Sequence, residues 1–408
     1  MKATPPALGL YLHIPFCKSK CVYCDFYSLP QAESRMDDYT DALCAHLAET
    51  APFAADHLVD TVYFGGGTPS YLGVKRLTKL LKVVLKKFKV AKDAEITLEA
   101  NPDSAGDWKE LRSLRKCGFN RLSLGMQSAD DEELAEIGRV HTMAQVSAAV
   151  EAARKAKFEN LSLDLIYGLP HQTLEGWQKN LSAAVDLAPE HLSCYGLKVE
   201  EGTPLARRVE AGEVLPDDDT QADRYLWTVG RLERAGFAQY EISNFAKPGH
   251  ESRHNLRYWL TRPYIGFGPG AHSDFGGRRY SFVRNLDAYI RGVLEGGSIL
   301  DSEELIPRQE RCGEYLMLRL RTALGIEEWE YRRNYFMDFA PLERRLEEFQ
   351  AQGWAEKTAE GRWRFTPKGF LVSNQLIGDL LDRQEQAQLS DVLVRARARY
   401  SGRGEQEG

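Results

Sequence analysis

The sequence lacks the features that place a chain in a membrane or on a nucleic acid. Its 408 residues contain no apolar run of about 18 residues, so we expect no membrane-spanning helix. The segment from Met1 to Ala7 lacks the apolar stretch of a signal peptide, which predicts a cytoplasmic location. The formal net charge of −6 at pH 7 gives no electrostatic reason to expect a nucleic-acid partner.

Cysteine is also scarce, and its use argues against a disulfide framework. The chain has seven cysteines, an odd number, which fits reduced thiols in a large chain without a secretion signal. Four of them are isolated in sequence and are predicted to be small core residues: Cys44, Cys117, Cys194 and Cys312. The other three form the spacing C-x3-C-x2-C at Cys17, Cys21 and Cys24.

This cysteine triplet predicts a metal centre. Thiolates are the ligands that iron–sulfur clusters and zinc select, and three of them on one short loop can hold a single cluster. A four-iron cluster held by three cysteines would keep one iron free for a small molecule. A zinc site with His13 as fourth ligand is the alternative, but no second cysteine or histidine knuckle follows. A redox pair of Cys21 and Cys24 fits less well, because no helix pattern starts at the motif.

The order of apolar segments predicts an α/β fold. Six short strands alternate with helices between residues 8 and 235, a pattern typical of parallel strands joined by right-handed crossovers. We therefore expect a partial (β/α)6 barrel over residues 1–238. The polar residues that follow or end these strands should meet at one end of it. They are the cysteine loop, Gly65 to Pro69, Glu99, Gln127 and Asp164.

The rest of the chain divides into three predicted parts. Residues 239–300 are rich in glycine, aromatic residues and histidine, and we expect an irregular segment that covers the barrel. Residues 301–400 have helical periodicity followed by a hairpin pattern, which predicts a mostly helical, winged-helix-like domain. Acidic residues interleave with its arginines, which favours a packing or substrate-covering role over DNA binding. Residues 401–408 are polar and predicted to be disordered.

The cysteine spacing, the run from Gly65 to Pro69 and the later motifs resemble the radical S-adenosylmethionine (radical SAM) superfamily, in its coproporphyrinogen dehydrogenase-like branch, over nearly the whole chain. The resemblance implies a [4Fe-4S] cluster on Cys17, Cys21 and Cys24 that cleaves or holds SAM. It assigns no catalytic side chain. The positions that match SAM-contacting residues of the family are Tyr11, Tyr23, Gly66, Gly67, Thr68, Glu99, Gln127, Arg139 and Asp164. In the decarboxylating relatives, the last three belong to a second SAM molecule.

Two features bear on the branch of the family. Coproporphyrinogen dehydrogenases carry a further cysteine where this chain has Phe26, and a longer segment before the motif than the 16 residues that precede Cys17. The stretch His254-Asn255-x-x-Tyr258-Trp259 is similar to the H-N-x-x-Y-W motif of HemW-type haem chaperones. This resemblance implies that His254 ligates haem, with His250 and His272 as nearby alternatives. A hydrogen-bonded packing histidine is the structural alternative.

The resemblance thus implies a protein that binds haem and hands it to acceptor haemoproteins. Membrane respiratory enzymes are the acceptors we expect, which would bring the chain to the inner membrane face as a peripheral protein. A homodimer is compatible with the family. Two other interpretations stay open: an oxygen-independent coproporphyrinogen III dehydrogenase that forms protoporphyrinogen IX, and a radical SAM enzyme that acts on another substrate.

Overall fold

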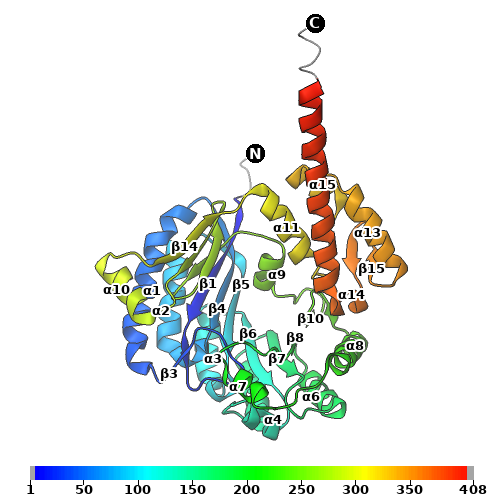
Figure 1. Cartoon of the computed structure of the whole chain (residues 1–408). Helices are drawn as coiled ribbons and strands as arrows, with labels where there is room; N and C mark the ends of the chain where they lie inside the picture. The colour runs from blue at the N-terminus through cyan, green and yellow to red at the C-terminus, as the bar shows by residue number, and fades with distance from the viewer. Residues whose placement is uncertain (1–4, 402–408) are drawn as a thin grey trace. The chain divides into compact units, whose positions relative to one another are not determined.

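The computed structural model describes residues 5–401, with side chains described as far as residue 387, and is built around one 12-stranded sheet (Figure 1). Six neighbouring strands are parallel, as the sequence predicts. They are β1 (Ala7–Ile14), β4 (Leu58–Gly66), β5 (Val90–Ala100), β6 (Arg121–Gln127), β7 (Asn160–Tyr167) and β8 (His191–Gly196). These strands form the wall of the partial barrel, and their carboxyl ends lie at the same end of the sheet.

The parallel strands form where the sequence is apolar on the helix-facing side. In β1, Leu8, Leu10 and Leu12 are fully buried at alternate positions, while Tyr11 and His13 lie on the other face. Alternation of this kind lets one face pack on helices and leaves the inner face for polar groups.

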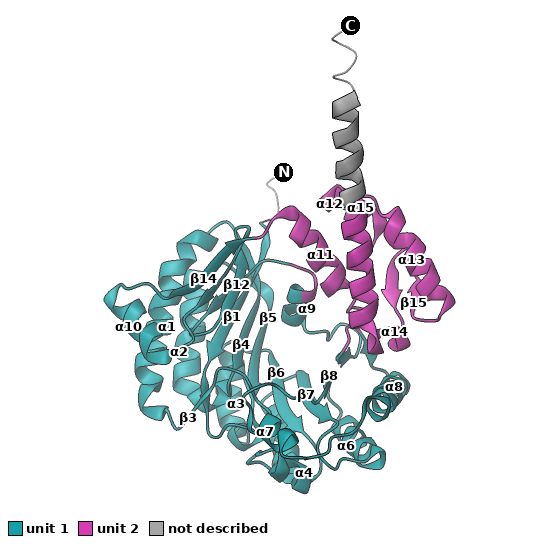
Figure 2. Cartoon of the chain, in the orientation of Figure 1, with its two compact units in different colours: residues 1–239, 243–258, 262–305 teal, residues 240–242, 259–261, 306–408 magenta. Residues whose placement is uncertain are grey.

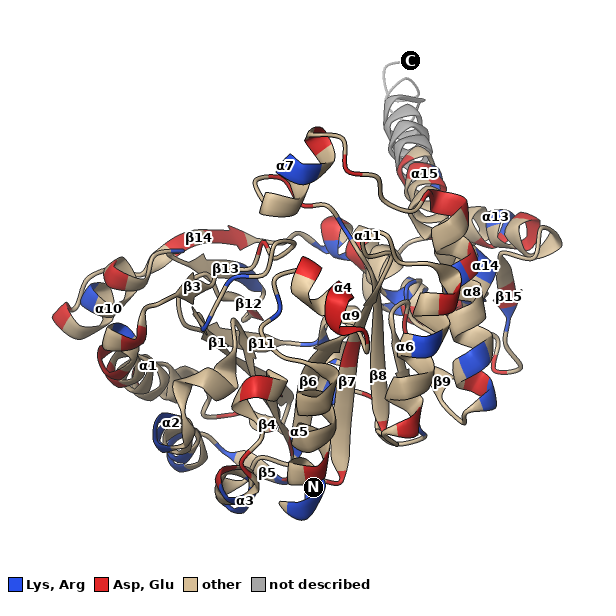
Figure 3. Ribbon diagram, turned by 90° about the horizontal axis from the view of Figure 1, so that it is seen from below, with Lys and Arg blue, Asp and Glu red and all other residues tan. Residues whose placement is uncertain are grey.

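Helices cover the outer face of the sheet. The helices of the barrel unit are α1 (Met36–Thr50), α2 (Val74–Lys87), α3 (Trp108–Cys117), α4 (Asp131–Glu136), α5 (Met143–Lys155), α6 (Leu174–Asp186), α7 (Pro204–Glu210), α8 (Asp218–Arg234), α9 (Arg253–Trp259) and α10 (Leu286–Glu295). Of these, α9 packs on the inner face, where His254 stacks on Tyr63. The short strands β2 (Phe16–Cys17) and β3 (Leu29–Pro30) pair beside the cysteine loop. Charges are mixed over the surface, with lysines along α2 and acidic residues along β14 (Figure 3).

The segment 239–300 differs from the irregular cover that we expected. Its strands extend both edges of the sheet. In sequence, α9 lies between the strands of one edge and the strands of the other. The strands at these edges are β9 (Ala238–Gln239), β10 (Asn244–Ala246), β11 (Tyr264–Phe267), β12 (His272–Phe275), β13 (Arg278–Phe282) and β14 (Leu300–Leu305). β11 pairs in parallel with β1, and β10 pairs antiparallel with β8. Short strands interrupted by glycine turns carry too little alternation to be recognised from sequence.

The chain folds into two compact units (Figure 2). Unit 1 comprises residues 1–239, 243–258 and 262–305, and unit 2 comprises residues 240–242, 259–261 and 306–408. Unit 2 contains α11 (Arg308–Arg319), α12 (Glu328–Tyr335), α13 (Ala340–Ala351), β15 (Ala355–Lys357), β16 (Trp363–Phe365), α14 (Pro367–Leu371) and α15 (Ser373–Ser401). The antiparallel hairpin of β15 and β16 forms where the sequence pattern predicts it.

Two further expectations concern membrane-spanning helices and the C-terminal tail. In the described part of the chain, no helix combines the length and apolar character needed to cross a bilayer. Residues 402–408, most of the tail that the sequence predicts to be disordered, lie outside the described residues.

Candidate functional site

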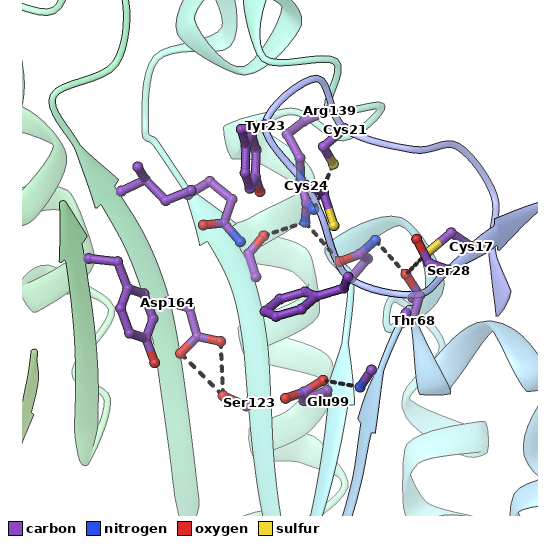
Figure 4. Close-up of a pocket in the computed structure, with 18 of the residues that line it drawn as sticks. Cys17, Cys21, Tyr23, Cys24, Ser28, Thr68, Glu99, Ser123, Arg139 and Asp164 are labelled. Carbon is purple, nitrogen blue, oxygen red and sulfur yellow. Dashed lines mark hydrogen bonds between the residues drawn. The ribbon is translucent and has the colours of Figure 1, made fainter. Parts of the chain in front are cut away.

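A cavity of about 590 Å³ opens at the carboxyl ends of the parallel strands, within unit 1 (Figure 4). Eleven of the thirteen predicted site residues line it: Cys17, Cys21, Tyr23, Cys24, Gly66, Gly67, Thr68, Glu99, Gln127, Arg139 and Asp164. Residues far apart in sequence thus meet at one end of the barrel, as expected from the strand ends. Tyr11 and His254 do not line the cavity.

The three cysteines lie on one loop and all are free thiols. The Thr68 hydroxyl donates to Cys17 Sγ at 3.6 Å, and Arg139 Nη1 donates to Cys21 Sγ at 3.4 Å. Burial raises the pKa of both Cys17 and Cys24. Without a bound cation the thiol form is therefore favoured there, and a metal would have to supply the charge that stabilises the thiolates. Three adjacent thiols facing a cavity fit a cluster with one iron left open.

The glycine run packs so tightly that a side chain has no room. Gly66 adopts φ +113°, and a Cβ there would lie 2.6 Å from His13 Nδ1. A Cβ on Gly67 would lie 3.0 Å from Cys17 Sγ. The amide hydrogens of the run point back into the protein, since Gly67 N donates to Ile14 O at 2.9 Å and Gly66 N to Glu99 Oε2 at 3.1 Å. The run therefore offers no amide nest for an anion, and the adjacent carboxylate suits a ligand's ammonium group.

Two half-buried carboxylates face the cavity. Glu99 accepts from the Tyr63 hydroxyl at 2.6 Å, and burial raises its pKa to about 7. Asp164 accepts from the hydroxyl of Ser193 at 2.6 Å, and burial raises its pKa as well. Both acids are disfavoured as anions by their surroundings, so a cationic ligand would stabilise them. The sulfonium and ammonium groups of SAM have this charge.

Two further predicted residues are held in unusual positions. Arg139 is half-buried and donates through Nη2 to Asn101 Oδ1 at 2.7 Å and to Gly125 O at 2.9 Å. Gln127 ends β6 with φ +64°, a left-handed conformation that is uncommon outside glycine. Such backbone strain concentrates at ligand sites, where it directs a side chain.

His254 and Tyr11 lie behind the cavity wall. The His254 side chain is buried, with the residue 1% exposed, and both ring nitrogens are engaged: Nδ1 with Thr61 Oγ1 and Nε2 with the Tyr258 hydroxyl, each at 2.9 Å. Burial lowers the pKa of His254 to about 3, so the ring is neutral. To ligate haem iron it would first have to break one of these hydrogen bonds. The assignment of His254 as haem ligand stays a prediction that this geometry does not favour.

Several lining residues escaped the sequence analysis. Three serines donate to Asp164: Ser123 on β6 and Ser193 on β8, which both line the cavity, and Ser162 on β7, the strand of Asp164 itself. Each serine follows a buried leucine in its strand. This Leu-Ser pair recurs on β6, β7 and β8, and the repeat could have indicated these serines from the sequence alone. Arg121, which also lines the cavity, was visible as a charge at the head of an apolar strand.

A cluster-binding loop and a carboxylate wall at the open end of a partial barrel define the class: this is a radical SAM protein. The sequence profile of the Radical SAM superfamily matches residues 11–183. The solved structure of coproporphyrinogen III oxidase (HemN) from Escherichia coli, a radical SAM enzyme, superposes with a TM-score of 0.80 at 26% identity, covering 92% of this chain and 90% of that one. Membership implies a [4Fe-4S] cluster and SAM.

Curated relatives identify the family within this class. The haem chaperone HemW of Bacillus subtilis is 36% identical over 91% of this chain and 98% of its own length. HemW of Mycobacterium tuberculosis H37Rv is 44% identical over 78% and 82%, and HemW of Escherichia coli K12 is 35% identical over 91% and 97%. The chain belongs to the HemW haem chaperone family.

Proposed function

We propose that this chain binds haem and delivers it to acceptor haemoproteins. The names of its relatives support haem binding, and their similarity spans most of both chains. In this proposal Cys17, Cys21 and Cys24 hold the cluster. SAM lies against the glycine run and Glu99, and the region of Gln127, Arg139 and Asp164 is a candidate for a second SAM molecule.

The observation that carries the haem proposal is the apolar rim of the cavity. Phe26, Val140 and Tyr195 line the cavity and are 65%, 49% and 40% exposed. Large apolar side chains at a cavity mouth are suited to the face of a flat macrocycle. Phe26 stands where the dehydrogenases have a cysteine, so the cysteine loop here presents an aromatic ring. Lys198, also at the rim, is exposed and suits a haem propionate.

A haem titration tests this proposal. We would reconstitute the cluster under anaerobic conditions, add haem, and follow the Soret band for wild type, Phe26→Ala and Phe53→Ala. Phe53 is 77% exposed and lies away from the cavity in the short helix Ala51–Ala54, so it is a matched control. Loss of one buried aromatic contact costs about 1.5–3 kcal/mol, so Phe26→Ala should bind haem roughly tenfold or more weakly. Equal titrations for all three proteins would contradict the proposed haem surface.

The enzyme alternative has its own test. Incubation with coproporphyrinogen III, SAM and reductant should give no protoporphyrinogen IX, whereas haem-loaded protein should transfer haem to an apo-haemoprotein. Formation of protoporphyrinogen IX would favour the dehydrogenase. We further propose a cytoplasmic protein that meets respiratory haemoproteins at the inner membrane face and forms homodimers. Cross-linking to membrane acceptors and sedimentation analysis check these points.

A further inference from the structure

Helix α9, which carries His254, is anchored to two strands of the barrel. The Glu95 carboxylate of β5 accepts from the backbone N–H groups of Arg253 and His254, each at 3.0 Å. Arg257 forms an ion pair with Asp60 of β4. Asn255 of the same helix lines the cofactor cavity, although His254 does not. The helix therefore supports the cavity wall, with His254 on its buried side.

The His254 ring is fixed in its plane. Hydrogen bonds hold it at both nitrogens, through Thr61 on one side and Tyr258 on the other. Its face packs on the ring of Tyr63, with centroids 5.1 Å apart and an interplanar angle of 23°. The Tyr11 ring lies 6.2 Å from Tyr63 and 6.4 Å from His254, nearly parallel to both. Because two hydrogen bonds fix the His254 ring, it also restricts the orientation of the Tyr63 ring that packs on it.

The contact continues from Tyr63 into the cavity. The Tyr63 hydroxyl donates to Glu99 Oε1 at 2.6 Å, and Gly66 N donates to Glu99 Oε2 at 3.1 Å. One of the two groups that orient this carboxylate is thus a tyrosine whose ring rests on His254. The orientation of Glu99 decides where a cation can bind on this wall.

We propose that His254 is a positioning residue of the SAM site, which acts through Tyr63 to hold the Glu99 carboxylate toward bound SAM. This role uses the hydrogen bonds that the ring makes, and it requires no free nitrogen. It rests on the proposed placement of SAM against Glu99, and it does not depend on haem transfer, since it concerns SAM and the cluster alone.

The test compares SAM binding by the full-length, cluster-reconstituted protein and its variants. His254→Ala removes both hydrogen bonds and the ring contact. Partners that orient a direct ligand are typically worth about 10–100-fold in affinity, so we expect SAM to bind at least tenfold more weakly. His254→Gln, which keeps an amide toward Tyr258, should recover part of this affinity. The control is His171→Asn, because the His171 side chain is 76% exposed and asparagine tolerates its φ of +57°.

Two readouts separate positioning from a general structural role. Iron and sulfide content, and the electron paramagnetic resonance (EPR) spectrum of the reduced cluster without SAM, should match wild type. The spectral change that SAM induces should require higher SAM concentrations in His254→Ala. If that variant does not fold, Tyr258→Phe deletes only one hydroxyl of the clamp and should show a smaller loss in the same direction.

Two results would overturn the proposal. The first is wild-type SAM affinity in His254→Ala or, where that variant does not fold, in Tyr258→Phe. The second is a His254→Ala protein that loses its haem Soret band while SAM affinity is unchanged, which would make His254 a haem ligand. A failed haem titration of wild type would count against the proposed function and would leave the SAM result unaffected.

Discussion

At the scale of single residues, Glu99 is the group whose charge state responds to the cofactor. The pKa of Glu99 is raised to about 7: burial is the largest cause, the nearby Asp164 adds to the shift, and hydrogen bonds from Tyr63 and Gly66 oppose it. Other charged or titratable groups that face it are Arg121, Tyr11 and Tyr258. Near neutral pH a part of the population therefore carries a proton on Glu99, which a cationic ligand should displace.

We predict that SAM binding releases a proton from Glu99. The positive charges of SAM favour the carboxylate and lower its pKa, so protons leave at pH values below and around 7. Above about pH 8 Glu99 is already ionised, and its contribution disappears. Titration calorimetry in two buffers of different ionisation enthalpy gives the number of protons released. At pH 6.5 the wild type should release more protons than Glu99→Gln, and at pH 8.5 the two proteins should release the same number. If the two proteins release equal numbers of protons at both pH values, Glu99 does not titrate on binding.

At the residue scale, the sequence indicates chemistry most directly where the residues involved are close together in the chain. Cys17, Cys21 and Cys24 are close in sequence, and their spacing alone indicates a metal centre. His254 was found by its motif, but its environment was not, because Thr61 lies 193 positions away and Glu95 lies 159 positions away. A motif names a side chain, whereas the groups that occupy its nitrogens come from the tertiary fold.

At the scale of elements, α9 depends on a cap from another strand. Glu95 is 6% exposed and accepts two backbone N–H groups at the start of the helix. A helix start otherwise leaves such donors without partners, and a buried donor that loses its acceptor costs about 1–3 kcal/mol. The short α9 thus owes its place to a carboxylate on a strand that is distant in sequence.

We predict that Glu95→Ala lowers the melting temperature by several degrees, because the backbone N–H groups of Arg253 and His254 lose their acceptor and that of His254 is buried. Glu95→Gln keeps one carbonyl oxygen and should lose less. Differential scanning calorimetry of the two variants beside wild type measures this order. An alanine variant as stable as the glutamine variant would show that the cap contributes nothing.

Element prediction was accurate for the six parallel strands and poor for residues 239–300. The first six carry apolar runs flanked by helices, and the physical signal is the buried apolar face that packs on those helices. The edge strands β11 to β14 are short and separated by glycine turns, and every residue of β14 is exposed. An edge strand needs little apolar alternation, so its sequence resembles a loop.

At the scale of the whole molecule, the two units share the chain in an interleaved way. Residues 240–242 and 259–261 belong to unit 2, although the sequence on either side of each belongs to unit 1. Within unit 2, Ile242 N donates to Arg321 O at 3.0 Å, and Ala323 N donates to Tyr240 O at 2.9 Å. The predicted boundary at residue 301 is close to the final crossing but does not include these earlier ones.

We predict that a chain ending at Leu305 is less soluble than the full chain, because Tyr240 and Ile242 lose their backbone partners and their packing. Coexpression of residues 306–408 as a separate polypeptide should restore part of the soluble yield. The measurement is the soluble fraction after anaerobic expression, with iron content per chain. A soluble, cluster-loaded 1–305 fragment would show that the interleaved segments do not require unit 2.

The pairing of β1 with β11 has a consequence for synthesis on the ribosome. Gly9 of β1 pairs with Tyr264 of β11. The ribosome must therefore add 255 residues after Gly9 before β11 can pair with β1. At about 5–20 residues per second this takes roughly 10 to 50 s. During that interval the nascent barrel has β1 as an open edge, and α9 has only just been made when β11 arrives. The cluster loop is therefore translated long before the wall behind it can close, and cluster insertion has a natural window in the growing chain.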